Sequence, residues 1–546
     1  MVKNKFVRVL LLSSVFAAAT AGTSMAEEWR QKDGFWQYVN SDGSLLTSSW
    51  VKSKDKWFYL GEDGNMLADS LIEDGSDHYY VDADGAMVRE QWVKLADNED
   101  AGELSWYYFG SSGKAYKGKS DKLSTKEIGG KKYLFDENAK MITGYVTAEG
   151  QRVDPDNKSP YIETMYFFGD DGAMYQNQWH RYEMTADDDV YSRFGMRNYK
   201  FYDEMWMYFD HTGKKAYAKS LDAAKIMRIG EKSYTFDENG IMIPHLSIEN
   251  ATVSAATGSD AKYRYGSLDN DGHLADEFWA FTVPPEEMSE EDYHSQEYSW
   301  FRTRNNGKVH KNKIYEVFDR KYAFDEIGRM QTGFVVMQPD GSFGKQFEVD
   351  AFSLSDFKDG TLEEMLPIIR RGNLYLFGTD ELNDGSMRIG DQVSVVLSDG
   401  TAIFGFNKRG VAYGNRGKLQ KVDSKYYING LLLKADPDLK YGIVKDTTRS
   451  ASDPFWAVVD INGKQVKDSK SILKDGEGSW ILIRNGRFVG RVADADKPRW
   501  YTKNGQTGFW RYDKSQKGME RYVELIGGED SDPDSFGSDF VLYSTY

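Results

Sequence analysis

A short aromatic pattern recurs along this chain and constrains its fold more than any other feature. Two or three aromatic or apolar residues are followed by a few polar residues, a glycine and another apolar residue. Clear copies lie at 57–60, 78–81, 106–109, 166–168, 206–209, 234–236 and 322–324. A repeat every roughly 20 to 45 residues is the signature of an array or solenoid. The function is therefore to be sought in the repeat.

One copy shows what the repeat can form. In a strand over 57–60, Trp57 and Tyr59 point to one face, while Phe58 and Leu60 point to the other. The dipeptide Asp63-Gly64 is typical of a hairpin turn, so Met66 is expected to begin a return strand. A single hairpin is marginally stable, whereas stacked hairpins bury a shared spine. We predict an all-β fold, an elongated β-solenoid of stacked β-hairpin repeats.

The first residues of the chain have the pattern of a secretory signal peptide. Three basic residues precede an apolar run over 9–19, and Ser24-Met25-Ala26 fits a cleavage site, which predicts a signal peptide at 1–26. This run is too short for a membrane span, and no other segment approaches the roughly 18 continuous apolar residues that a span needs. The chain has no cysteine, which excludes a disulfide framework. We expect a protein that is secreted or located at the cell surface, on the cell wall.

The charge of the chain bears on its partners. Without the three basic residues of 1–26, 69 − 3 = 66 basic residues face 86 acidic ones, a net charge of 66 − 86 = −20. Such a surface repels the phosphates of nucleic acids, so no nucleic acid partner is expected. Aromatic residues make up 14% of the chain, which is too many for disorder.

The repeat predicts two regions after the signal peptide. It is clear over 27–335 and becomes degenerate over 336–546, where hairpin repeats continue with insertions. Insertions are expected at 181–202, 284–296 and 353–371. The last should hold a short helix that begins with a capping box at Thr361 and ends near Pro367. The acidic tract 527–539 is expected to be a loop.

Several segments resemble a known family of repeats. The run 49–52, followed by 56–60 and 63–67, resembles the choline-binding or cell-wall-binding repeat of Gram-positive surface proteins, and 133–145 resembles the related glucan-binding and clostridial-toxin repeats. The resemblance implies that two tryptophans of one hairpin and an aromatic residue of the next repeat enclose a quaternary ammonium by cation–π attraction. The ligand-binding residues that it implies are Trp50, Trp57, Tyr59 and Tyr80 at one site, and Trp92, Trp106, Tyr108 and Tyr133 at another.

Only these two sites keep both tryptophans in this reading. Trp179 is separated from Trp206 by an insertion, and the segments that begin at Gly144 and Gly333 have lost the first tryptophan. The remaining aromatic residues either stack on sugar rings or fill the spine of the solenoid.

No pattern in the sequence indicates catalysis. The seven histidines are scattered, and no nucleophile motif or phosphate loop is present. Two acidic turns, 82–85 and 269–272, are similar to the start of a calcium loop but have Val93 and Ala280 where that loop needs its twelfth-position glutamate. We expect no catalytic residue, metal or cofactor, and a protein that is not an enzyme.

The sequence therefore predicts a binding protein with many weak sites. The expected partner is a cell-wall polysaccharide, recognised through teichoic acid choline or glucan, and held tightly by multivalency. One alternative is a host-glycan adhesin or a toxin-like receptor-binding array. Another is a cell-wall hydrolase with a hidden catalytic region.

Overall fold

The computed structural model describes most of the chain after residue 26. The described residues are 27–96, 104–119, 121–154, 157, 159–183, 191–198, 204–252, 261–267, 271–359, 366–378, 384–446, 455–467, 472–492, 497–503, 505–513, 518–522 and 541–543. The predicted signal peptide and the acidic tract 527–539 lie outside them. The chain divides into two compact units: unit 1 is Met1–Ala251 with Gly266–His273, and unit 2 is Thr252–Tyr265 with Leu274–Tyr546.

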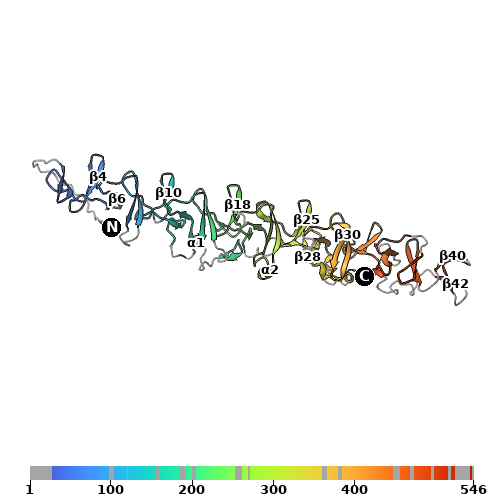
Figure 1. Cartoon of the computed structure of the whole chain (residues 1–546). Helices are drawn as coiled ribbons and strands as arrows, with labels where there is room; N and C mark the ends of the chain where they lie inside the picture. Colours follow the sequence, from blue (N-terminus) through green and yellow to red (C-terminus); the bar gives the residue numbers. More distant parts are fainter. Residues whose placement is uncertain are drawn as a thin grey trace. The chain divides into compact units, whose positions relative to one another are not determined.

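Unit 1 is a series of two-stranded antiparallel hairpins (Figure 1). Its elements are β1 (Glu28–Lys32), β2 (Phe35–Val39), β3 (Ser49–Ser53), β4 (Lys56–Leu60), β5 (Ser70–Asp74), β6 (Asp77–Val81), β7 (Gln91–Ala96), β8 (Leu104–Phe109), β9 (Lys126–Ile128), β10 (Lys131–Tyr133), β11 (Gly144–Val146), α1 (Pro160–Glu163), β12 (Tyr166–Phe168), β13 (Gln178–Glu183), β14 (Tyr191–Ser192), β15 (Arg197–Asn198), β16 (Glu204–Phe209), β17 (Lys225–Ile229), β18 (Lys232–Phe236) and β19 (Leu246–Ile248). The strand β13 pairs with β16, and β14 pairs with β15 inside the insertion between them.

The glycine turns do not join the two paired strands of a hairpin, and the chain returns at Met66 as an isolated antiparallel bridge instead of the predicted strand. Strand β3 turns into β4 at Lys54 and Asp55, before the glycine motif is reached. Gly64 then connects β4 to a short segment in which Met66 forms a single bridge with Leu60. The Met66 amide also donates to the Trp36 carbonyl of the preceding hairpin, at 2.7 Å. The glycine motif therefore links neighbouring hairpins.

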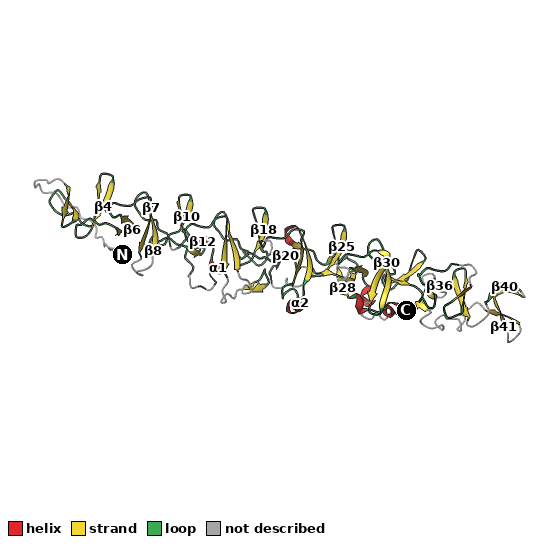
Figure 2. Cartoon of the chain, in the orientation of Figure 1, coloured by secondary structure: helices red, strands yellow, loops and turns green. Residues whose placement is uncertain are grey.

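The same link repeats along unit 1. The amide of Met87 donates to the carbonyl of Trp57, that of Met141 to Trp106, and that of Met242 to Trp206, at 2.8 to 2.9 Å. Each links a hairpin to the turn that follows the next one, which is the contact between neighbours that makes a solenoid. The chain is thus a β-solenoid of hairpin repeats with few helices (Figure 2).

Unit 2 has wider sheets. Its elements are β20 (Tyr263–Tyr265), β21 (Trp279–Thr282), α2 (Glu290–Ser295), β22 (Ser299–Arg304), the 3-10 helix η3 (Asn305–Gly307), β23 (Lys308–Val309), β24 (Lys313–Val317), β25 (Arg320–Phe324), β26 (Met330–Gln331), β27 (Gly333–Met337), β28 (Phe343–Phe347), the 3-10 helix η4 (Val349–Ala351), α3 (Leu354–Asp359), α4 (Leu366–Ile369), β29 (Asn373–Phe377), β30 (Gly390–Leu397), β31 (Gly400–Phe406), β32 (Gln420–Val422), β33 (Lys425–Ile428), β34 (Leu431–Leu433), β35 (Tyr441–Asp446), β36 (Phe455–Asp460), β37 (Ile472–Lys474), β38 (Trp480–Arg484), β39 (Arg487–Val492), β40 (Arg499–Lys503), β41 (Gln506–Asp513), β42 (Gly518–Tyr522) and β43 (Val541–Tyr543). It contains the five-stranded sheet β30-β31-β34-β33-β32 and the six-stranded sheet β37-β38-β39-β36-β35-β43. The predicted boundary at 335/336 stays a prediction.

The helix expected at 361–367 differs from the structure. Thr361 lies outside the described residues, and α4 contains Pro367 at its second position instead of ending near it. A proline is tolerated there because the first-turn amides have no partner within the helix.

The apolar core is divided into clusters. Small apolar clusters join neighbouring hairpins in unit 1, and a larger cluster of phenylalanines and aliphatic residues fills unit 2 from β27 to β36.

Candidate functional site

Two tryptophans and a tyrosine meet at the hairpin β7–β8 as the sequence predicted. Trp92 lies opposite Tyr108, and Trp106 lies one pair further along the same face. The ring centroids of Trp92 and Trp106 are 6.4 Å apart with an angle of 89° between the ring planes. Tyr133 of β10 closes the set, with its centroid 4.9 Å from that of Trp92. The structure thus brings together the four residues named for this site.

The hairpin β13–β16 carries the same arrangement, although the sequence analysis separated its tryptophans. Trp179 and Trp206 have centroids 6.5 Å apart at 82°, and Tyr234 of β18 lies 4.9 Å from Trp179. The insertion joins the end of β13, at Glu183, to the start of β16, at Glu204. The pairing of Trp179 with Tyr208 further along the hairpin is therefore undisturbed. The expectation that the insertion separates Trp179 from Trp206 is therefore wrong.

A third copy lies on β21–β22, which the sequence analysis also missed. Trp279 and Trp300 have centroids 6.3 Å apart at 86°, and Tyr322 of β25 lies 5.1 Å from Trp279. The sequence did contain a signal for all three sets. In each, the tyrosine from the next repeat stands two residues before a phenylalanine that stacks on the first tryptophan. That motif is Tyr-x-Phe at 133–135, 234–236 and 322–324.

The site predicted at Trp50 is built differently. Trp50 contacts Tyr59 and Tyr79, with centroids at 4.9 and 5.1 Å, and Trp57 makes no ring contact among the described residues. Tyr80 is buried on the other side of β6, where its ring lies 6.0 Å from Phe109 and its hydroxyl donates to Asp69. Tyr79 therefore replaces Tyr80 at this position, because neighbouring residues of a strand point to opposite faces.

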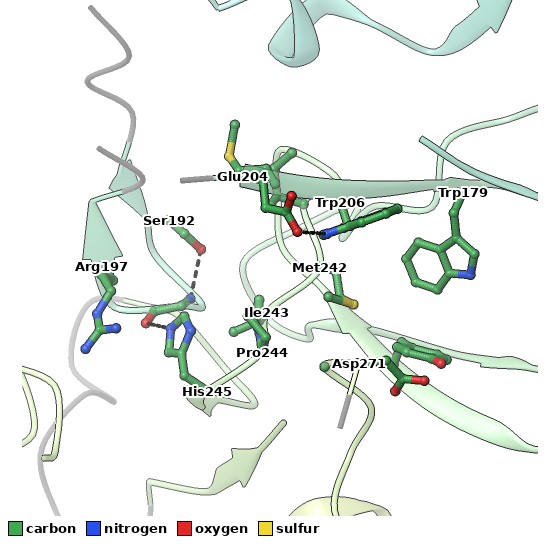
Figure 3. Close-up of a pocket in the computed structure, with 15 residues that line it drawn as sticks. Trp179, Ser192, Arg197, Glu204, Trp206, Met242, Ile243, Pro244, His245 and Asp271 are labelled. Carbon is green, nitrogen blue, oxygen red and sulfur yellow. Dashed lines mark hydrogen bonds between the residues drawn. The ribbon is translucent and has the colours of Figure 1, made fainter. Parts of the chain in front are cut away.

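The Trp179 set opens into a cavity of about 410 Å³ within unit 1 (Figure 3). Trp179 and Trp206 stand at one end, Met242 and Ile243 line the middle, and Ser192, Arg197 and His245 lie at the other end. This volume falls in the range of small-molecule sites.

The hairpin β14–β15 forms the far wall of this cavity and is held in place by hydrogen bonds. The His245 Nε2–H donates to the Gly195 carbonyl at 2.8 Å, and the Gly195 amide donates to Ser192 Oγ at 2.8 Å. Burial, with the positive charge of Arg197, lowers the pKa of His245 to about 3, so the imidazole is neutral. Phe194 is fully buried. The wall is thus preformed.

Two carboxylates flank the rings of this set. Glu204 accepts a hydrogen bond from Trp206 Nε1 at 3.0 Å and pairs with Arg181 at 3.1 Å. Asp271 pairs with Lys232 at 2.8 Å; partial burial alone would raise the pKa of Asp271, but hydrogen bonds from Lys232 and His273 lower it. Glu204 therefore lies at the N–H edge of the Trp206 indole, and each of the two carboxylates is paired with a basic side chain.

Two models of repeat families match segments of this chain. A model of the choline-binding repeat matches residues 44–87, and a model of the putative cell wall binding repeat matches residues 105–115. These are choline-binding repeats. Repeats of this type indicate binding to choline or to the cell wall. Among curated proteins, none matches this sequence.

Solved structures of Streptococcus pneumoniae proteins are similar to parts of this chain. Choline binding protein F is 16% identical, with a TM-score of 0.31, over 71% of this chain and 99% of that one. The modular autolysin LytC in complex with a synthetic peptidoglycan ligand is 18% identical, with a TM-score of 0.31. That match covers 57% of this chain and 54% of the autolysin, so it spans about half the length of that protein. In the described part of this chain, no helix is long and apolar enough to cross a membrane.

Proposed function

We propose that this choline-binding repeat protein holds choline-bearing polymers of the bacterial cell wall through several aromatic cages, and that it is a secreted binding protein and not an enzyme. The observation that carries the proposal is the agreement between the Trp92 and Trp179 sets. Their tryptophan centroids are 6.4 and 6.5 Å apart, their planes cross at 89° and 82°, and each tyrosine lies 4.9 Å from the first tryptophan. In both sets a further tyrosine, Tyr108 or Tyr208, pairs with the first tryptophan across the hairpin, so the two sets share their residues as well as their geometry.

The chemistry of the cage suits a quaternary ammonium. A trimethylammonium group has no N–H to donate, so it gains little from hydrogen-bond acceptors and much from aromatic faces, at roughly 0.5 to 2 kcal/mol per favourable ring. The strongly acidic chain adds a general attraction for cations.

Several weak sites on one chain give tight binding to a polymer that carries many copies of the ligand. After the first cage is occupied, the next choline on the same polymer binds at a high effective concentration. A free choline molecule gains nothing from this effect. The proposal therefore expects strong retention on a decorated wall and weak affinity for choline itself.

Retention on purified cell walls tests the proposal. The full chain is mixed with choline-containing walls and with walls from cells grown with ethanolamine in place of choline. We expect the chain to sediment with the choline-containing walls only, because choline and ethanolamine differ only in the methyl groups on nitrogen. Free choline should release the bound chain. Equal retention on both would exclude the cages as the site of attachment.

The absence of catalysis needs its own test. Dye-labelled walls are incubated with the full chain, and soluble dye is measured after the walls are removed. We expect no release above that of walls alone, whereas time-dependent release would support the hydrolase alternative.

A further inference from the structure

The hairpin β21–β22 differs from its two sister hairpins in where it places its charge. In all three, the four positions around the tryptophans lie on one face, because cross-strand partners and residues two apart point the same way. In the sister hairpins, a tyrosine faces the first tryptophan and a basic residue faces the second. In β21–β22, Arg302 faces Trp279 and Phe281 faces Trp300. The aromatic and basic positions are exchanged.

The basic residue of β21–β22, Arg302, lies beside the first tryptophan instead of the second. The Arg302 guanidinium lies 5.6 Å from the ring centroid of Trp279 and 5.4 Å from that of Phe318. Arg302 is only 4% exposed, and burial lowers its pKa from the usual arginine value. An arginine remains protonated in proteins. A cation on Trp279 would thus meet a like charge close by and little screened, which disfavours a quaternary ammonium at this copy.

The part of this face around the second tryptophan, Trp300, is an exposed aromatic surface. Phe281, Tyr298 and Trp300 are 53%, 55% and 42% exposed. The centroid of Phe281 lies 4.8 Å from that of Trp300 and 5.2 Å from that of Tyr298, and both pairs of planes are tilted by 33°. We call these three residues the aromatic platform. At the same place the sister hairpins carry Lys94 and Arg181 beside their second tryptophans.

We propose that the aromatic platform binds a neutral pyranose unit of a polysaccharide, so that β21–β22 recognises sugar where its sister hairpins recognise a quaternary ammonium. Exposed rings gathered in one place mark a binding surface more often than a scatter of single apolar residues does. A pyranose ring presents a flat patch of C–H bonds that packs on aromatic faces while its hydroxyls stay in water. It carries no charge, so Arg302 does not oppose it, in contrast to a choline group.

The platform is continuous with the tryptophan pair. Trp300 belongs both to the platform and to the set around Trp279. The sugar site at β21–β22 does not depend on the proposed choline sites, whereas the contrast with the sister hairpins rests on them.

The test uses chitotetraose and isomaltotetraose as probes, one from β-linked N-acetylglucosamine and one from α-linked glucose. Saturation transfer by NMR from the full chain to the probe reports contact with its C–H protons. We expect transfer to at least one probe at millimolar concentration. Phe281→Lys, which restores the residue type of the sister hairpins, should weaken binding roughly three- to tenfold, as expected for the loss of one stacking ring. Lys94→Ala is the matched control and should leave the signal unchanged.

The reverse exchange tests the second half of the inference. Arg302→Tyr places a tyrosine opposite Trp279, as in the sister hairpins, and should raise the number of choline molecules bound per chain. Phe281 is exposed, so Phe281→Lys should keep the thermal midpoint of the wild type, which separates a lost site from a lost fold.

Three outcomes would overturn the assignment: no saturation transfer to either probe, transfer that is undiminished in Phe281→Lys, or a mass that rises with concentration in the wild type and not in Phe281→Lys. The last would show that the platform joins two copies of the chain. Failure of choline to bind any cage, with sugar binding intact, would reject the proposed function and leave this inference standing.

Discussion

The indole rings of Trp179 and Trp206 stand at 82° to each other with centroids 6.5 Å apart, although the whole segment 184–203 lies between their strands. The pairs Trp92–Trp106 and Trp279–Trp300 repeat this relationship at 6.4 and 6.3 Å. The insertion takes the place of the turn between β13 and β16, and the paired residues of the two strands stay in register. The repeat can therefore acquire new walls, such as β14–β15, without losing its aromatic pair.

The first prediction concerns one wall of the Trp179 cage. Trp206→Ala should weaken binding of choline at this site by about 1 to 2 kcal/mol, and Trp206→Phe by less, because a smaller ring keeps part of the cation–π attraction. Calorimetric titration of the full chain with choline measures both. Trp36→Ala removes an exposed tryptophan outside the three sets and is the control. Equal losses in Trp206→Ala and Trp36→Ala would contradict the prediction.

The second prediction separates the two neighbouring tyrosines of β6. Tyr80→Ala should lower the free energy of unfolding of its region by about 3 kcal/mol, because it removes a buried ring. Tyr80→Phe should cost about 1 kcal/mol, the value of its hydrogen bond to Asp69. Neither change should alter the amount of choline bound. Loss of bound choline in Tyr80→Phe, with the fold intact, would return Tyr80 to the site.

Much of this architecture could be predicted from the sequence, for physical reasons. The aromatic triplets fix strands locally, so the hairpin repeat was expected correctly, and the resemblance to known repeats supplied the Trp92 set. The exchange of Tyr79 for Tyr80 was not expected, because a shift of one residue along a strand reverses its face and nothing local reveals which face the next hairpin covers. Trp179 and Trp300 were missed because pairing across an insertion depends on the tertiary fold.

The third prediction compares two glycines with similar backbones. Gly150 and Gly34 have φ of +91° and +87°, but a Cβ at Gly150 would lie 2.7 Å from the Leu123 Cα, whereas none of the surroundings of Gly34 lies within 4 Å. Gly34→Ala should cost about 1 kcal/mol from backbone strain alone. Gly150→Ala should cost roughly 1 to 3 kcal/mol more. Thermal unfolding of the two variants measures the difference, and equal midpoints would count against the close packing of this turn.

The fourth prediction concerns acid stability at His180. Its ring lies 3.8 Å from that of Phe167 and hydrogen-bonds with the Tyr145 hydroxyl at 2.8 Å, and burial lowers the pKa of His180 to about 4. The usual pKa of histidine is about 6.5. Between pH 6.5 and 4 the unfolded chain therefore binds a proton at this residue that the folded chain does not, so stability falls as pH falls.

The variant His180→Phe isolates this effect from other titrating groups. The loss per pH unit should be somewhat below ~1.4 kcal/mol, because residual exposure screens the charge. Asp237, whose pKa burial raises to about 8, acts in the opposite direction but is present in both proteins. The thermal midpoint of the wild type should fall more steeply than that of His180→Phe from pH 6.5 to 4. Parallel curves would show that His180 is not linked to stability.

The central claim is that the aromatic sets at Trp92 and Trp179 each hold one quaternary ammonium. Calorimetric titration with choline of the wild-type chain, of Trp92→Ala, of Trp179→Ala and of the double variant tests it most directly. We expect each single variant to bind one choline fewer than the wild type and the double variant to lose both, with thermal midpoints that show all four chains folded. An unchanged number of bound choline molecules in the double variant, or no heat of binding in the wild type at high choline concentration, would contradict the claim.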